Sequence, residues 1–398
     1  MAAIFTRPGL AARMAGQLLD PGPLDENLRS GLFLSGIRRT GKTTFLKHDL
    51  IPALEQRGAL VVYVDLWSDV AIEPAELLRA SIRTTLADVQ EPGSKLMARL
   101  RALGGVSLDV AGIGFSFDLE DVGLPDGVTL SEALTELVDR TGADVALIID
   151  EVQQALSSKA GSDMLLALKA ARDAINTRPD TPGHLLFIGT GSHRAYVAEL
   201  TSRRSQAFAG AASVPYPLLG SDYVEHLHTR LVQSDVESLP SPPAMLAALE
   251  RLGHRPEELL RALRLLTEHR GEGCDPDDVL AIVSNTLRAG AADIELHKLE
   301  RSGPLAQQVF ERIVEADGEA RGLYARAALD DYTERLGRRI TSTDVQQVLE
   351  ELTAENLIMR AGHGRYAITD QFVQTVWAER AQRAQRTGAV LAAPGEID

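Results

Sequence analysis

The stretch LFLSGIRRTGKTTFL, residues 32–46, joins an apolar run to an amphipathic stretch through a turn that contains two glycines. Its centre, from Gly36 to Thr43, matches the pattern G-x-x-x-x-G-K-[ST]. Glycines let the backbone coil so that successive N–H groups point inward, and the helix that follows adds the positive end of its dipole. Because the turn lies between a predicted strand and a predicted helix, it indicates a phosphate-binding loop rather than an ordinary connection.

The whole loop is expected to contact a bound triphosphate. In this interpretation the Lys42 ammonium reaches the β- and γ-phosphates and the Thr43 hydroxyl ligates Mg²⁺. The expected contacts come from Gly36, Ile37, Arg38, Arg39, Thr40, Gly41, Lys42, Thr43 and Thr44.

A second apolar run, VALIIDE at 145–151, ends in two acids, Asp150 and Glu151. An unpaired buried carboxylate is costly, so a buried strand that ends in two acids suggests a nearby cation or basic partner. Beside a phosphate-binding loop, Asp150 would hold Mg²⁺ and Glu151 would activate the attacking water. The alternative is a solvated strand end with ordinary surface acids.

A third apolar run, LLFIGTGSH at 185–193, ends in two hydroxyl side chains, Thr190 and Ser192. Either hydroxyl could orient the water or touch the γ-phosphate. An equally reasonable reading is a capped turn before the next helix. His193 is interpreted as a bystander.

The order of apolar runs and helical patterns predicts an α/β fold with a parallel sheet covered on both faces. One segment interrupts this order, because 104–120 alternates apolar and polar residues around a glycine pair and so predicts an inserted hairpin. The predicted strands are 32–36, 59–66, 144–150 and 184–191, and the predicted helices are 43–56, 73–86, 130–141 and 162–176.

The remainder of the chain has a different composition. After residue 220 the pattern is helical up to about 300, and then an amphipathic helix, a strand, a Gly-His-Gly turn and a second strand follow. That order describes a winged helix-turn-helix module. The predicted domains are a leader at 1–30, the α/β domain at 31–220, a helical domain at 221–300, a winged-helix domain at 301–385 and a tail at 386–398.

Composition narrows the functional classes. The 398 residues carry a formal net charge of −15, which argues against a general nucleic-acid coat because phosphate binding needs an excess of basic residues. The single cysteine, Cys274, cannot form an internal disulfide. No apolar run approaches the roughly 20 residues of a membrane span, so we expect a cytoplasmic protein with no membrane contact.

These motifs resemble the AAA+/STAND P-loop ATPases, in particular the archaeal and bacterial branch related to origin-recognition proteins. The resemblance rests on FLSGIRRTGKTTFL, LIIDEVQQAL, FIGTGSHR and the closing winged-helix pattern, and it covers roughly 30–380. It implies an ATP- and Mg²⁺-binding ATPase in which the helical domain acts as a lid. The inserted hairpin is similar to one in these relatives.

The resemblance also implies further site residues. Arg203 or Arg204 would be the arginine that completes a neighbouring subunit's site in a homo-oligomer, although a solvated basic helix face is as good a reading. Arg255, or alternatively Arg261, would contact the γ-phosphate from the lid. Asp65 ends the second predicted strand and is interpreted as a cap.

Two functions from different classes follow. The first is an ATP-hydrolysing conformational switch that acts on an unidentified protein client. The second is an ATP-gated DNA loader or regulator that uses the winged helix. The expected recognition helix, 342–356, carries acids but no lysine or arginine, and this charge favours a protein-contact or autoinhibitory role over DNA binding. A P-loop GTPase is disfavoured because the chain has no Asn-Lys-x-Asp motif.

Overall fold

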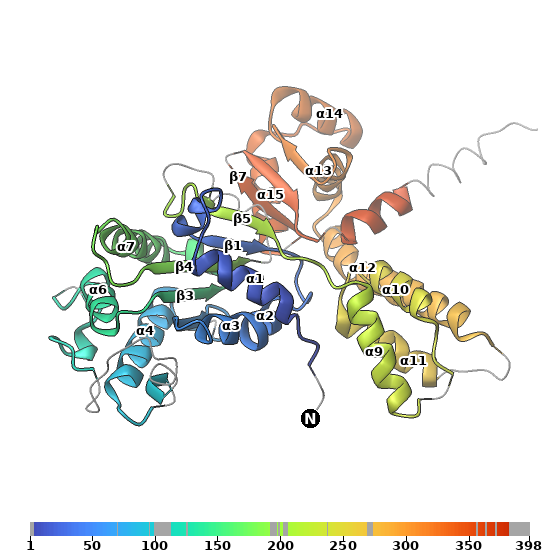
Figure 1. Cartoon of the computed structure of the whole chain (residues 1–398). Coiled ribbons are helices and arrows are strands. Elements are labelled where there is room, and N and C mark those ends of the chain that lie inside the picture. Colours follow the sequence, from blue (N-terminus) through green and yellow to red (C-terminus); the bar gives the residue numbers. More distant parts are fainter. Residues whose placement is uncertain are drawn as a thin grey trace, which may run out of the picture. The chain divides into compact units, whose positions relative to one another are not determined.

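A computed structural model shows two compact units, Met1–Pro217 and Leu218–Asp398. Figure 1 colours the chain from blue at the N-terminus to red at the C-terminus. The structure describes residues 4–69, 71–94, 96–98, 113–124, 126–191, 197, 200–201, 206–236, 238–268, 274–355, 357–362, 364–370 and 372–381.

The first unit is built on a five-stranded parallel sheet with strand order β2-β3-β4-β1-β5. Its central strands are buried along their whole length, as expected for near-continuous apolar runs covered on both faces. The strands are β1 Leu32–Ser35, β2 Leu60–Asp65, β3 Val145–Asp150, β4 Leu185–Gly191 and β5 Ala212–Pro215.

Helices cover both faces of this sheet (Figure 1). One face packs on α4 (Pro74–Gln90), α6 (Leu130–Thr141) and α7 (Lys159–Asn176). The other face packs on α1 (Pro8–Leu19) and on the helix that follows the glycine-rich loop. Helix α1 buries Ala11, Ala15 and Leu18 completely, so the predicted leader contributes to the core of this unit.

The helix after the loop changes its winding along its length. It begins as α2 (Lys42–Phe45), widens into a π-helical turn over Leu46–Leu50 and continues as α3 (Ile51–Glu55). Pro52 gives a physical reason, because proline lacks the N–H and crowds the carbonyl of the preceding turn. The Ile51 amide instead donates to the Leu46 carbonyl, five residues back.

The predicted α/β fold with a parallel sheet is confirmed, and four of its five strands coincide with predicted apolar runs. Strand β5 was not predicted, since ASVP lies at the sheet edge, is largely exposed and offers no apolar run. The predicted hairpin at 104–120 lies outside the described residues as far as 112. Its described part, 113–120, contains no strand, and Leu119–Asp121 forms a short 3-10 helix.

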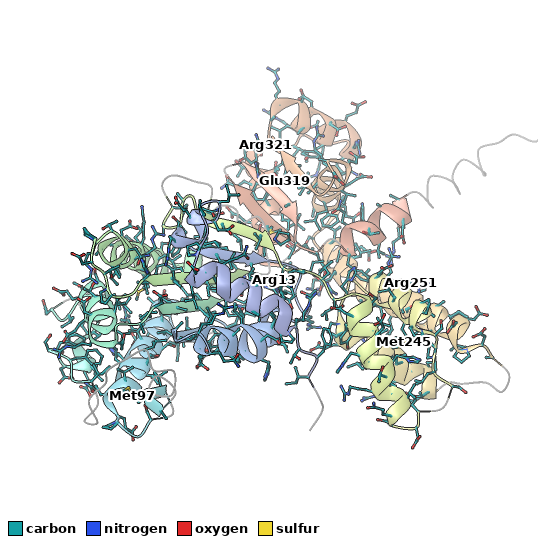
Figure 2. The ribbon with its side chains drawn as sticks, viewed as in Figure 1. Arg13, Met97, Met245, Arg251, Glu319 and Arg321 are labelled. Atoms are coloured by element: carbon teal, nitrogen blue, oxygen red, sulfur yellow. The ribbon has the colours of Figure 1, made fainter. Side chains whose placement is uncertain are left out.

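The second unit begins with four helices, α9 Ser221–Gln233, α10 Pro242–Arg251, α11 Pro256–Glu268 and α12 Pro276–Arg301. Helix α10 points Met245 into their shared core, and its Arg251 donates to the Ser284 hydroxyl on α12 at 2.8 Å (Figure 2 labels both α10 residues). These helices lie where the sequence predicts the lid.

The C-terminal part of this unit has the element order helix, strand, helix, helix, strand, strand. Its three strands form an antiparallel sheet in the order β6-β8-β7, and Glu319 and Arg321 mark β6 in Figure 2. The end of α12 contributes Ala292, Leu296 and Leu299 to this core, so one continuous helix serves both parts. The elements are α13 Pro304–Glu315, β6 Glu319–Arg321, α14 Arg326–Leu336, α15 Ser342–Ala354, β7 Ile358–Gly362 and β8 Arg365–Ile368.

Candidate nucleotide-binding site

The glycine-rich loop follows β1 and is anchored at its start. The Gly36 amide donates to the Gly191 carbonyl at 3.1 Å, which ties the loop to β4. A Cβ on Gly36 would lie 3.3 Å from the Cβ of Tyr216, so little room exists there for a side chain. Gly41 has a φ of 91° directly before α2, a left-handed conformation that glycine adopts without steric cost.

Lys42 folds back into the turn of the loop. Its ammonium donates to the carbonyls of Gly36 and Ile37, both at 2.8 Å, and the residue is only 5% exposed. Burial lowers the pKa of Lys42, while the nearby carboxylates of Glu151 and Asp150 oppose the shift. A buried ammonium whose partners are neutral carbonyls has its charge available for an anion.

Asp150 ends β3 on the face covered by the loop's helix, and three hydroxyl groups converge on its carboxylate. Thr43 donates to Oδ2 at 2.7 Å and Tyr63 donates to the same oxygen at 3.1 Å, while Thr190 donates to Oδ1. Asp150 is 1% exposed. The loop and the acidic strand, 107 residues apart at Thr43 and Asp150, therefore meet in one site.

Glu151 turns the chain sharply at the end of β3. Its φ of 57° and ψ of 46° are left-handed, a conformation that costs a non-glycine residue about 1–2 kcal/mol and that often marks functional sites. Its amide donates to the Thr190 hydroxyl at 3.3 Å, and its carboxylate accepts from the Gln153 amide. Thr190 thus contacts both members of the acidic pair.

The chemistry of the side chains at this site suits a Mg²⁺ ion. Thr43 and Asp150 offer only oxygen ligands, which Mg²⁺ prefers. In the part of the chain that the structure describes, no group of three or more His, Cys, Asp or Glu side chains is placed to hold a metal ion.

The rest of the loop contributes different features. Arg38 lies over the ring of Trp67, 4.3 Å from its centroid, just beyond the end of β2. Thr40 is fully buried and its hydroxyl donates to the Ile37 carbonyl at 2.8 Å, which closes the loop. Arg39 and Thr44 have exposed side chains.

Other predicted site residues are placed differently. Ser192, Arg203 and Arg204 lie outside the described residues. Arg255 belongs to the second unit, where its guanidinium donates to Asp370 and lies 5.5 Å from the centroid of the Phe372 ring. Its predicted contact with a nucleotide therefore stays a prediction.

Two contributors to the site were missed from the sequence. Tyr63 was read only as part of a strand, although it is a polar residue two positions before the strand end at Asp65. Trp67 follows the same strand and carries no motif of its own. Only the sheet register, which pairs Tyr63 with Ile148 and Asp65 with Asp150, shows that this strand end borders the acidic pair.

Comparison with known proteins agrees with this geometry. Residues 26–197 match the family described as AAA domain. No curated protein matches the chain significantly. None of the described helices combines the length and apolar character needed to cross a membrane.

Two solved structures share the fold at low sequence identity. A Walker-type ATPase of Pyrococcus abyssi is 20% identical, with 93% of this chain and 95% of that chain covered and a TM-score of 0.53. The ORC2 protein of Aeropyrum pernix in its ADP form is 14% identical, with 99% and 96% covered and a TM-score of 0.52. The segment 26–197 thus matches the AAA domain family, in a chain that shares the fold of this ORC2 protein.

Proposed function

We propose that the protein is a Mg²⁺-dependent ATPase that works as a nucleotide-driven conformational switch. The observation that carries this proposal is the contact between the Thr43 hydroxyl and the Asp150 carboxylate at 2.7 Å. It supports a site in which the loop binds the triphosphate and the acidic strand faces the same cation.

We assign the roles of the side chains as follows. Lys42 and the loop amides hold the phosphates, and Thr43 and Asp150 hold Mg²⁺, which would neutralise charge on the transferred phosphoryl group. Glu151 accepts a proton from water as the water oxygen bonds to the γ-phosphorus and the bond to the β-phosphate oxygen breaks. Thr190 holds the acidic pair in place through the two hydrogen bonds described above.

The switch requires parts beyond the α/β unit. We assign Arg255 as the lid residue that contacts the γ-phosphate, and Arg203 or Arg204 as the arginine offered to a neighbouring copy. In this structure Arg255 is paired with Asp370, so contact with a nucleotide would require that ion pair to open. ATP binding and rearrangement of the second unit would then be coupled.

The C-terminal part is proposed to be a winged helix that contacts a protein client. Helix α15 has no basic residue, and Gln346, one of its two glutamines, already donates to Glu350 at 3.1 Å. In β8, Arg365 lies 2.9 Å from Glu319. These observations favour protein contact over the alternative, ATP-gated DNA binding, because readout of DNA needs free basic or amide groups.

The first test compares Glu151→Gln and Lys42→Ala with the wild type in ATP binding and hydrolysis. Glu151→Gln should retain ATP and lose about 10²–10⁴-fold in hydrolysis, the usual contribution of a general base. Lys42→Ala should bind ATP about 10–100-fold more weakly, because it loses charge-assisted hydrogen bonds of roughly 1.5–3 kcal/mol. Glu91→Gln, an exposed acid at the end of α4, is the matched control and should behave as wild type.

Equal turnover in Glu151→Gln and the wild type would remove Glu151 from its role. Stabilisation by GTP but not ATP in a thermal-shift panel would overturn the nucleotide assignment. An ATP-dependent, salt-sensitive shift of duplex DNA in a gel would favour the DNA alternative. Mass measurement in solution with no nucleotide, with ADP and with a slowly hydrolysed ATP analogue tests assembly and the neighbouring arginine together.

A further inference from the structure

Tyr63 lies beside the acidic pair but belongs to none of the three motifs. It sits on the edge strand β2, where its register partner is Ile148 on β3. Asp150 is two residues further along β3 and faces the same side of the sheet. Aromatic side chains can reach such diagonal neighbours, and the Tyr63 hydroxyl donates to Asp150 Oδ2 at 3.1 Å.

The loop's helix holds the tyrosine ring from the other side. The Lys47 ammonium lies 5.0 Å from the centroid of the Tyr63 ring. Lys47 comes four residues after Thr43, at the start of the π-helical turn. Thus Thr43 and Lys47, on one helix, contact Asp150 and Tyr63 on two neighbouring strands.

The protonation state of Tyr63 is fixed by its surroundings. Burial raises the pKa of the Tyr63 hydroxyl well above its ordinary value, and the carboxylates of Asp150 and Asp65 raise it further. The hydroxyl donates to the Asp150 carboxylate from outside the loop.

We propose that Tyr63 is a positioning residue that orients Asp150 and so sets the affinity of the nucleotide site for its divalent cation. This inference rests on the proposed function. Thr43 donates to the same Oδ2 but also has a lone pair for a cation, whereas Tyr63 holds the carboxylate from outside the loop. Mutation of a hydrogen-bond partner of a ligating carboxylate typically lowers metal affinity or activity by about 10–100-fold.

The test is Tyr63→Phe, which removes one oxygen and keeps the ring. The affinity for a fluorescent ATP analogue is measured at increasing Mg²⁺ concentrations. A sample with EDTA gives the affinity without metal. The Mg²⁺ concentration for half-maximal gain in affinity should rise about 10-fold, while affinity in EDTA stays within about twofold. Hydrolysis at saturating Mg²⁺ should recover to within a few-fold of wild type.

Tyr332→Phe is the matched control. Tyr332 is a buried tyrosine of the second unit, and its hydroxyl has no hydrogen-bond partner in the described part of the chain. The control should reproduce the wild-type Mg²⁺ curve. Thermal melting without nucleotide checks that both variants are folded.

Three results would count against the assignment. Superposed Mg²⁺ curves for Tyr63→Phe and a Mg²⁺-dependent wild type would overturn this inference alone. Equal loss of affinity with Mg²⁺ and with EDTA, or a much lower melting temperature, would show a merely structural role and also overturn it. A wild type whose ATP affinity ignores Mg²⁺ would overturn this inference, and one that also hydrolyses ATP equally well in EDTA would overturn the proposed function itself.

Discussion

Charged side chains at the candidate nucleotide site of the first unit and in the C-terminal part of the second unit have different kinds of partner. At the first, the Asp150 carboxylate is held by hydroxyl groups and the Lys42 ammonium by carbonyls, so neutral partners hold both charges. At the second, Asp331 accepts from both Arg312 and Arg335, and Glu319 pairs with Arg365. Charge held by neutral groups stays available for a ligand, whereas charge in internal ion pairs is already neutralised.

This contrast is what we expect if a polyphosphate binds at the first region rather than at these ion-paired arginines of the second unit. Binding of a polyphosphate needs positive charge without a carboxylate partner, together with a cation site. The second unit pairs several arginines with carboxylates of its own. These pairs are Arg255–Asp370, Arg288–Glu379, Arg312–Asp331 and Arg365–Glu319.

The largest effect is expected for Asp150→Asn. It should lower ATP hydrolysis about 100-fold or more and abolish the gain in ATP affinity from Mg²⁺, since a bound metal stabilises several kcal/mol of transition-state charge. The free energy of unfolding without nucleotide should be unchanged or higher by up to about 1 kcal/mol, because a buried carboxylate without a basic partner disappears. Steady-state hydrolysis and urea unfolding measure the two effects.

The same strand supplies the control for that variant. Asp144 precedes β3 at its opposite end, where its carboxylate accepts from the His184 amide at 2.7 Å. Asp144→Asn should leave hydrolysis unchanged. If Asp150→Asn kept Mg²⁺-dependent turnover, the Asp150 carboxylate would not be needed for the cation, and the contrast drawn from its neutral partners would fail.

A smaller effect is expected for Asp331→Asn, which removes the shared partner of Arg312 and Arg335. These side chains are partly exposed, so the variant should lower the free energy of unfolding of the second unit by about 0.5–1 kcal/mol. ATP hydrolysis should not change. The chain has two tryptophans, one in each unit, so Trp67→Phe leaves Trp377 as the fluorescent reporter of the second unit during urea unfolding.

Asp330→Asn is the control for this pair, because Asp330 is exposed and makes no ion pair among the described residues. It should leave the urea midpoint unchanged. A loss of ATP hydrolysis in Asp331→Asn with the fold intact would show that these ion pairs also serve the nucleotide site, and the contrast between the two regions would fail.

Sequence alone predicts the elements of the first unit that carry local motifs. The strands that carry Asp150 and Thr190 were predicted because central parallel strands are near-continuous apolar runs. The loop was predicted because its chemistry requires glycines and lysine at fixed spacing. Both signals are local along the chain.

What could not be predicted depends on partners distant in sequence. The hydrogen bond of Tyr63 to Asp150 depends on strand register, and no local pattern encodes that register. Strand β5 lacks an apolar run because it is an exposed edge. The pairing of Arg255 with Asp370 joins residues 115 positions apart, so the sequence suggested a nucleotide contact without showing this carboxylate.

The smallest effect is expected at two helix capping boxes, one in each unit. In both boxes a carboxylate accepts hydrogen bonds from the N-cap residue. Glu132 accepts from the amide and hydroxyl of Thr129 at the start of α6, and Asp344 accepts in the same manner from Thr341 at the start of α15. These hydrogen bonds lower the pKa of both carboxyl groups. Each cap satisfies amides that the first helical turn leaves without partners.

The sign of the pH dependence follows from the lowered pKa values. A carboxylate with a lowered pKa in the folded state contributes its full stability above its ordinary pKa of about 4 and loses it as pH falls through the lowered value. Urea midpoints of Glu132→Gln and Asp344→Asn should therefore lie below wild type by a constant amount between about pH 5 and 7, and the gap should close below about pH 4. A gap that widened in acid would mean that these carboxylates stabilise the helices in their protonated form. Because both boxes rest on local hydrogen bonds, the two variants should behave alike, in contrast to Asp150→Asn and Asp331→Asn.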